Sequence, residues 1–168
     1  MITYRDAGVA DIPAIDALFR ASFVGTFGHL YPPEDLTAFL AKYTAQAWAD
    51  DLTQADLRIR LAEEDGAAIG FAKVSDITLP VTPAGPALEL RQLYLLEGAK
   101  GRGVADALMH WAIDQAKGRG AEELFLSVYV DNHRGKRFYA RYGFEDVGAY
   151  TFMVGSHADE DRLMRRAI

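Results

Sequence analysis

A short glycine-containing run carries the residues of this chain best suited to bind an anion. The run consists of Lys100, Gly101, Arg102 and Gly103. It follows a β-type segment ending near Leu96 and precedes a helical pattern beginning near Val104. The first N–H groups of a helix lack internal partners and attract anions, glycines allow close backbone approach, and the two cations add charged donors. A pyrophosphate suits this construction, and a tight turn with solvated charges explains the same residues equally well.

The run does not match two familiar phosphate-binding motifs, and other catalytic chemistries find little support. A P-loop needs Gly-Lys-Ser/Thr after four intervening residues, and a dinucleotide fingerprint needs a third glycine; neither is present. Cysteine is absent, which excludes thiol nucleophiles and disulfides. The four histidines are His29, His110, His133 and His157. None of them pairs at the spacing of a helical metal motif, so no metal site is expected.

A second group of candidates lies shortly after the run, in a short amphipathic segment. Asn132, Lys136 and Tyr139 are separated by four and by three residues, so they share one face of a predicted helix. Phe138 and Tyr142 form a separate stripe, which we assign to the core. From the residues alone, Tyr139 is more simply explained as one more buried aromatic side chain.

The elements that position these residues follow from hydrophobic periodicity. Alternation predicts strands at 2–5, two within 57–76 joined by a turn at Glu64-Asp65-Gly66, and others at 88–96, 123–130, 149–155 and 161–168. Helical spacing predicts helices from Asp11 as N-cap to about 23, at 36–43, 104–117 and 132–142, with 47–57 ambiguous. This order predicts one α+β (α/β layered) domain with a mixed sheet, spanning residues 1–168.

Composition and charge limit the class of protein. Half of the 168 residues are apolar and 25% are charged, which is typical of a soluble globular protein. No signal sequence and no apolar stretch of membrane-spanning length is evident, so a cytoplasmic protein is expected. A net charge of −6 disfavours nucleic-acid binding and is compatible with a cationic small substrate.

Two stretches resemble the motifs of the GNAT superfamily of acyl-CoA-dependent N-acetyltransferases. In "LYLLEGAKGRGVADALM" the family pattern Gln/Arg-x-x-Gly-x-Gly/Ala falls on Lys100–Ala105, with lysine in the first position. "NHRGKRFYARYGF" is similar to Asn-x-x-Ala-x-x-Phe-Tyr-x-x-x-Gly-Phe, with Gly135 in place of alanine. The resemblance covers nearly the whole chain. "SFVGTFGHLYPPEDLTAFL" and the C-terminal tail look most like the bacterial branch that includes spermidine/spermine acetyltransferases.

The resemblance implies a mostly antiparallel sheet with a splayed strand pair that holds acetyl-CoA. The implied cofactor contacts are Leu93, Tyr94, Leu95, Lys100, Gly101, Arg102, Gly103, Val104, Ala105, Asn132 and Lys136. Backbone groups of the first three would bind the pantetheine arm as an added strand. Lys100 keeps a charged donor but lacks the planar fork of arginine, so a less well-fitted phosphate contact is expected.

The resemblance also implies roles in catalysis. Tyr139 becomes the candidate acid for the leaving thiolate, and Glu89, eleven residues before Lys100, the candidate base. Alternation would place Glu89, Arg91 and two leucines of the same strand on one face. A Glu89–Arg91 ion pair at a solvated strand end, with deprotonation by a water chain, fits the sequence equally well.

The acceptor remains the most open part of the interpretation. Phe27 and Tyr31 could line its wall, with Glu34 or Asp35 attracting a cation, although ordinary packing explains each of them singly. The function favoured is acetyl transfer to a primary amine of a small molecule, with a polyamine as one candidate. A protein or peptide amine and a non-catalytic acyl-CoA sensor are the alternatives, and a homodimer is left open.

Overall fold

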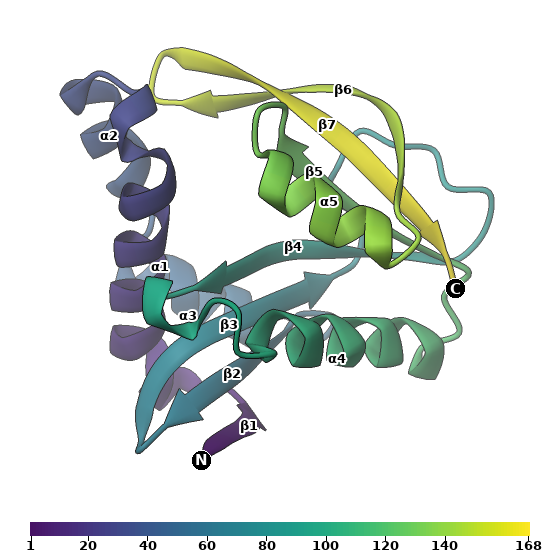
Figure 1. The fold of residues 1–168 in the computed structure, drawn as a ribbon, viewed down its shortest axis with the longest axis horizontal. Coiled ribbons are helices and arrows are strands. Elements are labelled where there is room, and N and C mark those ends of the chain that lie inside the picture. Colours follow the sequence, from purple (N-terminus) through teal and green to yellow (C-terminus); the bar gives the residue numbers. More distant parts are fainter.

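Residues 1–168 are described by a computed structural model, in which a seven-stranded sheet runs through the molecule (Figure 1). The strands are β1 (Ile2–Asp6), β2 (Arg58–Glu64), β3 (Ala67–Ser75), β4 (Ala87–Leu95), β5 (Glu123–Tyr129), β6 (Glu145–Val154) and β7 (His157–Ala167). Their spatial order is β1-β2-β3-β4-β5-β7-β6, and every neighbouring pair is antiparallel except β4 and β5. The expected mixed, mostly antiparallel sheet is therefore confirmed.

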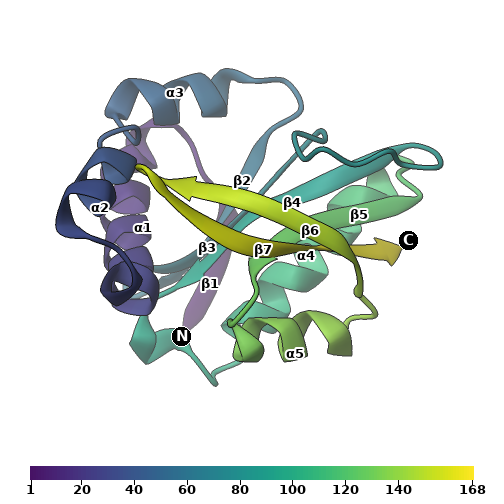
Figure 2. The same ribbon diagram turned by 90° about the horizontal axis from the view of Figure 1, so that it is seen from above.

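Helices cover both faces of this sheet. They are α1 (Ile12–Phe27), α2 (Pro33–Leu40), α3 (Ala45–Thr53), α4 (Val104–Gly118) and α5 (His133–Arg141), with short 3₁₀ turns at Val9–Asp11, Gly28–Leu30 and Glu97–Ala99. Figures 1 and 2 show α1, α2 and α3 gathered at one end and α4 and α5 at the other. Crossing a membrane requires a longer and more apolar helix than any that this fold contains.

Two large hydrophobic cores lie on opposite faces of the sheet. Along β3, Ala72 and Val74 belong to the core under α4, whereas Phe71 belongs to the core under α1 and α3. This alternation is what a strand buried on both faces requires. The α1 side is rich in aromatic rings, where Phe19 and Trp48 are fully buried and lie 5.9 Å apart between ring centroids.

Strand β4 contains the irregularity that shapes the centre of the sheet. Lys73 of β3 pairs with Gln92 and Val74 pairs with Leu90, so Arg91 is the extra residue of a β-bulge. The bulge reverses the alternation: Leu90 packs under α4, and so does Leu93 three residues later. The expectation that Glu89 and Arg91 share a face with the leucines after them is therefore wrong.

Strands β4 and β5 separate soon after they meet. Their parallel pairing joins only Ala87–Glu89 to Glu123–Phe125, after which no further pairs form. Beyond that point, the sides of β4 and β5 that face each other have no strand partner, while β3 and β7 still pair with their other sides. The expected splayed strand pair is present.

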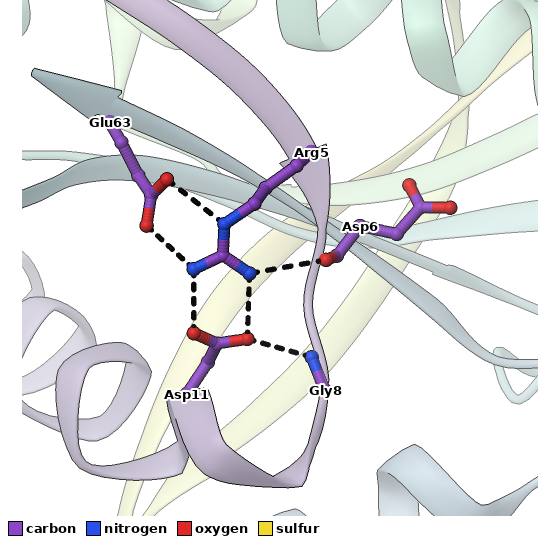
Figure 3. A network of polar contacts seen from close by, with 5 residues as sticks. All are labelled: Arg5, Asp6, Gly8, Asp11 and Glu63. Atoms are coloured by element: carbon purple, nitrogen blue, oxygen red, sulfur yellow. Dashed lines mark hydrogen bonds and ion pairs between the residues drawn. The ribbon is translucent and has the colours of Figure 1, made fainter. Parts of the chain in front are cut away.

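The N-terminal strand is held by a charged network (Figure 3). Arg5 donates to Glu63 of β2 and to Asp11, each at 2.7 Å, and the N–H of Gly8 donates to Asp11 at 2.8 Å. Hydrogen bonding from Arg5 lowers the pKa of Asp11. Asp11 directly precedes α1 as expected, but its carboxylate turns toward Arg5 and does not cap the helix amides.

The hairpin turns show where sequence reasoning succeeded and where it failed. The expected turn between β2 and β3 is confirmed, with Asp65 and Gly66 both at positive φ, as a two-residue hairpin requires. The expected polar turn between the last two strands is wrong in extent, because the chain is already in β7 at His157. Asp159 and Asp161 alternate inward along this strand, so its polar composition concealed a half-buried strand.

Candidate active site

A cavity of about 580 Å³ occupies the gap between β4 and β5. Its walls come from α1, β4, α4 with the loop before it, β5 and α5. Of the residues expected to bind the cofactor, it brings together Leu93, Tyr94, Leu95, Lys100, Gly101, Gly103, Ala105 and Asn132, and it also contains Phe27 and Tyr139. Residues from five elements far apart in the sequence therefore meet around one space.

The glycine run forms the entrance of α4 and leaves its first amides free. Gly101 and Gly103 have φ values of +74° and +80°, which side chains other than glycine rarely adopt. Gly103 is the N-cap residue, and no side chain caps the helix. A Cβ built on either glycine would enter open space. The run thus leaves the uncapped N–H groups of α4 at the cavity that Gly101, Gly103 and Ala105 line, as an anion site requires.

Two members of the expected phosphate loop do not line the cavity. Arg102 donates to both oxygens of Glu64 on β2, at 2.9 and 2.5 Å, so its guanidinium anchors the loop to the sheet. Val104 is fully buried and packs against Gly70 of β3, which fixes the position of the helix entrance. The side chains of Arg102 and Val104 support the loop, so at these two positions only the backbone remains available to a ligand.

Helix α5 presents a mixed face to the cavity. Asn132 caps the helix by accepting a hydrogen bond from the N–H of Gly135 at 3.0 Å. A Cβ at Gly135 would lie 2.7 Å from the Asn132 amide nitrogen, so the glycine makes room for the cap and not for a ligand. Lys136 lies outside the cavity lining, and its ammonium donates to the carbonyl of Val130 at 3.0 Å.

Tyr139 lies in the cavity wall with a hydroxyl that no protein group engages. Burial raises the pKa of its phenol to about 12. The side chain also packs against the core under α4, where its ring lies 5.9 Å from that of Phe144. Tyr139 therefore combines the two possibilities left open by the sequence: its ring is a core residue, and its hydroxyl is free at the cavity.

A second cavity, of about 360 Å³, adjoins the first. Arg91, Gln92 and Ser127 line both cavities. The other walls of the second cavity come from α3, the loop before it, the loop between β3 and β4, and β6. The bulge at Arg91 places this residue and Gln92 at the junction.

Comparison with known proteins decides the family. The model of the acetyltransferase (GNAT) family matches residues 13–144. The chain belongs to the GNAT acetyltransferase family. An uncharacterised N-acetyltransferase of Mycobacterium tuberculosis is 35% identical to it over 137 residues, which cover 81% of this chain and 84% of that protein. An uncharacterised N-acetyltransferase of Lactobacillus delbrueckii is 28% identical over 162 residues, covering 94% of this chain and 92% of the relative.

The fold of this acetyltransferase is also found among solved structures. The PaiA N-acetyltransferase from Thermoplasma acidophilum, crystallised in complex with coenzyme A, superposes with a TM-score of 0.84. The match covers 100% of this chain and 99% of that chain at 22% sequence identity. The expected fold class and the resemblance to N-acetyltransferases are thereby confirmed.

Sequence reasoning missed a basic face on α5 of the acetyltransferase. Arg134, Arg137 and Arg141 line the first cavity together with Lys100. Their spacing of three and four residues in "HRGKRFYARY" was the available signal, because such residues lie on one side of a helix. The ammonium of Lys100 itself lies 2.6 Å from Glu97 in the preceding turn.

Glu89 lies in the second cavity and not beside Tyr139 in the first. Its side chain is buried, and its carboxylate accepts hydrogen bonds from the N–H of Thr78 at 2.7 Å, the Thr78 hydroxyl at 2.9 Å and the N–H of Leu79 at 3.2 Å. It forms no ion pair with Arg91, which was the alternative considered from the sequence. These donors explain how an acidic side chain is tolerated in the interior.

The residues expected around the acceptor separate into different environments. Phe27 faces the first cavity, with its ring 6.2 Å from that of Tyr129. Tyr31 is buried away from both cavities, and its hydroxyl donates to Asp159 at 2.5 Å. Asp35 accepts hydrogen bonds from the backbone and hydroxyl of Ser156, which ties α2 to the β6–β7 turn. Glu34 lines neither cavity.

Asp161 carries the most perturbed carboxyl group outside the cavities. Burial, and secondarily the charge of Asp159, raise its pKa from 3.8 to about 7, against a lowering contribution from Ser127. Its register neighbours across the sheet are Tyr129 and Tyr150. The native state therefore binds a proton between these two pKa values that the unfolded chain releases, so the free energy of unfolding falls as pH rises through this window.

We expect Asp161→Asn to flatten this pH dependence. From about pH 4 to pH 7 the free energy of unfolding of the wild type should fall by ~2 kcal/mol more than that of the variant, because the asparagine has no proton to release. Denaturant unfolding at several pH values measures the difference. Parallel pH profiles for the two proteins would contradict the assignment.

Proposed function

We propose that this acetyltransferase moves an acetyl group from acetyl-CoA to a primary amine of a small molecule, by direct attack with both substrates bound. The observation that supports the proposal is the junction of two cavities at Arg91, Gln92 and Ser127. One cavity suits the cofactor and the other an acceptor, so the amine and the thioester can meet without a covalent enzyme intermediate. No cysteine is available to carry such an intermediate.

The first cavity fits the chemistry of coenzyme A. The uncapped amides behind Gly103 and the basic face of α5 suit its phosphates, while the backbone of β4 beyond the bulge lacks a strand partner on the β5 side and suits its amide-containing arm. Leu93 and Leu95 pack under α4, so the strand contributes backbone groups to the arm while its apolar side chains hold it in place. When bound, acetyl-CoA supplies the activated acetyl thioester.

The free hydroxyl of Tyr139 is proposed to stabilise the leaving sulfur. A phenol with a pKa of about 12 is a much weaker acid than a thiol of pKa about 8.5, so full proton transfer would be uphill by roughly 5 kcal/mol. Tyr139 therefore acts as a hydrogen-bond donor to the developing negative charge. Because this pKa lies far above neutrality, the hydroxyl keeps its proton throughout the usual assay range.

The role of Glu89 is tested by Glu89→Gln. The amide would replace one acceptor oxygen with N–H donors that face the donors of Thr78 and Leu79, so we expect a loss of stability of about 1–2 kcal/mol. We expect kcat to change by less than about threefold, with water taking the ammonium proton. A large fall in kcat together with loss of the acidic limb of the pH–rate profile would identify Glu89 as the base instead.

A thiol-release assay with acetyl-CoA tests the function itself. The panel contains amino acids, simple amines, peptides, and spermidine and spermine, which the resemblance to the polyamine-acetylating branch suggested. Release of coenzyme A that depends on a small amine supports the proposal. Release with peptides alone favours a protein or peptide acceptor, and tight acetyl-CoA binding without release favours a sensor.

A further inference from the structure

The second cavity contains a cation that the protein does not neutralise. Arg91 is half-buried in its wall and takes part in none of the ion pairs of the chain. A guanidinium is charged at any working pH and is seldom left unpaired in a cavity wall. Because Arg91 is the extra residue of the β4 bulge, the backbone irregularity itself directs this side chain to the junction.

The other charged groups of this cavity are already engaged. The ammonium of Lys73 is 2% exposed and lies 2.7 Å from Asp51 and 5.1 Å from the ring centroid of Trp48. Burial lowers the pKa of Lys73, and the charge and hydrogen bond of Asp51 raise it. The more distant charges of Arg91 and Glu89 make smaller contributions, Arg91 lowering the pKa and Glu89 raising it. Glu89 is held by three neutral donors of the 78–79 loop. With Lys42 at the exposed rim, the lining holds the three cations Lys42, Lys73 and Arg91 against the two carboxylates Asp51 and Glu89, so its net charge is positive and favours an anion.

Next to Arg91 in the chain, the side-chain amide of Gln92 contains an acceptor atom without a hydrogen-bond donor. The Oε1 atom of Gln92 is buried without a hydrogen-bond donor, and it is the only buried side-chain polar atom of the chain in that state. Buried polar atoms without partners are rare in folded proteins and point to a missing ligand or water. An acceptor on Gln92 and a cation on Arg91 therefore adjoin at the place where the two cavities meet.

Resting on the function proposed above, we propose that the acceptor is a primary amine that also carries a small oxyanion, such as the carboxylate of an amino acid. Its oxyanion binds Arg91, and its amine is directed to Gln92 at the junction. A carboxylate matches the planar fork of arginine in a two-point contact. The apolar sides of Tyr43, Trp48, Tyr150 and Phe152 accommodate its carbon skeleton. A cavity of about 360 Å³ holds one small molecule of this size.

The test compares substrates that differ only in the anion. L-leucine is paired with isoamylamine and with leucinamide, and L-phenylalanine with phenethylamine; the phosphonic acid analogue of leucine distinguishes a carboxylate from another oxyanion. We expect kcat/KM for the carboxylate of each pair to exceed that of the partner without a carboxylate by about 10- to 30-fold, as a charged hydrogen-bonded contact provides. The phosphonate can also make a two-point contact with the guanidinium, but its bulkier and more strongly hydrated group is expected to be accepted less well in a cavity of about 360 Å³.

Variants at Arg91 identify the group responsible. Arg91→Met should remove the preference, and Arg91→Lys should keep part of it, because the charge remains while the fork is lost. Differences in amine basicity cancel, since each substrate is compared between variants. Arg166→Met is the matched control, because this half-buried arginine lines neither cavity, and the hydrogen bond of its side chain goes to the carbonyl of Ala167. A circular-dichroism spectrum and a denaturant midpoint like those of the wild type show that Arg91→Met is folded, a readout that does not depend on the first cavity, which Arg91 also lines.

The outcomes separate this inference from the proposed function. Turnover of spermidine or of the amines without a carboxylate as efficient as that of the amino acids overturns the inference and leaves acetyl transfer intact. A preference that survives Arg91→Met also overturns it. Absence of turnover with every amine contradicts the proposed function. In that case, calorimetry with N-acetyl-L-leucine in the presence of coenzyme A tests the anion site at Arg91 by itself. Binding to the wild type that is lost in Arg91→Met supports the anion site, and equal or absent binding overturns it.

Discussion

Replacing Tyr139 by phenylalanine is expected to lower kcat about a hundredfold or more while the affinity for acetyl-CoA stays within about twofold. The ring remains in the core under α4, since the substitution removes only the hydroxyl. That hydroxyl has no partner in the protein, so its removal leaves no buried group unsatisfied and should not reduce stability. The fall in kcat would then come from weaker stabilisation of the transition state, in which the sulfur becomes negative.

Steady-state kinetics and calorimetry separate these two effects. Tyr142→Phe is a suitable comparison, because the Tyr142 hydroxyl donates to Asp106 at 2.5 Å and lies outside the cavity lining. We expect that variant to lose stability and to retain most of its turnover. An unchanged kcat in Tyr139→Phe would remove this residue from the mechanism and leave its ring as a core residue alone.

Gly103→Val is expected to weaken coenzyme A binding by about 30- to 100-fold, the loss expected when one or two charge-assisted backbone hydrogen bonds are blocked. Gly103 lines the cavity and a Cβ there meets no protein atom, so we expect the added side chain to take up space beside the α4 amides. Valine is also strained at a φ of +80°, so the variant should be somewhat less stable as well.

The contribution of strain can be measured independently. Gly120 lies just beyond the other end of α4, with a φ of +72° and open space at its Cβ position, and it lines neither cavity. Gly120→Val therefore carries a similar backbone strain without blocking the concavity. Isothermal titration of both variants with coenzyme A decides the matter: equal affinities for the two would show that the glycine run is not the phosphate site.

The order of elements could be read from the sequence because it depends on local signals. The alternation of apolar residues, the helical spacing of α1 and α4 and the turn at Glu64-Asp65-Gly66 each act within a few residues along the chain. The family resemblance in two separated motifs then indicated the fold and the place of the cavity. Most of the cofactor residues that the resemblance implied do line the first cavity.

The roles of individual polar side chains could not be read in the same way. Arg102 resembled a phosphate donor, yet Glu64, which is 38 positions away in sequence, pairs with it across the fold. Lys136 shares the expected helix face but reaches back to a carbonyl of the preceding loop. Such choices depend on which competing acceptor the tertiary structure places nearby. The bulge that isolates Arg91 likewise arises from strand register, which periodicity alone does not specify.

The two adjoining cavities are built from largely different parts of the chain. Segments around α4 and α5 enclose one, whereas α3, the 78–79 loop and β6 enclose the other, and only the residues of the junction are shared. Under the proposed function, substitutions in the second set would change which acceptor is bound and leave the binding of acetyl-CoA unchanged. Such a division would let related enzymes diverge in the acceptor that they use while they keep the same acyl donor.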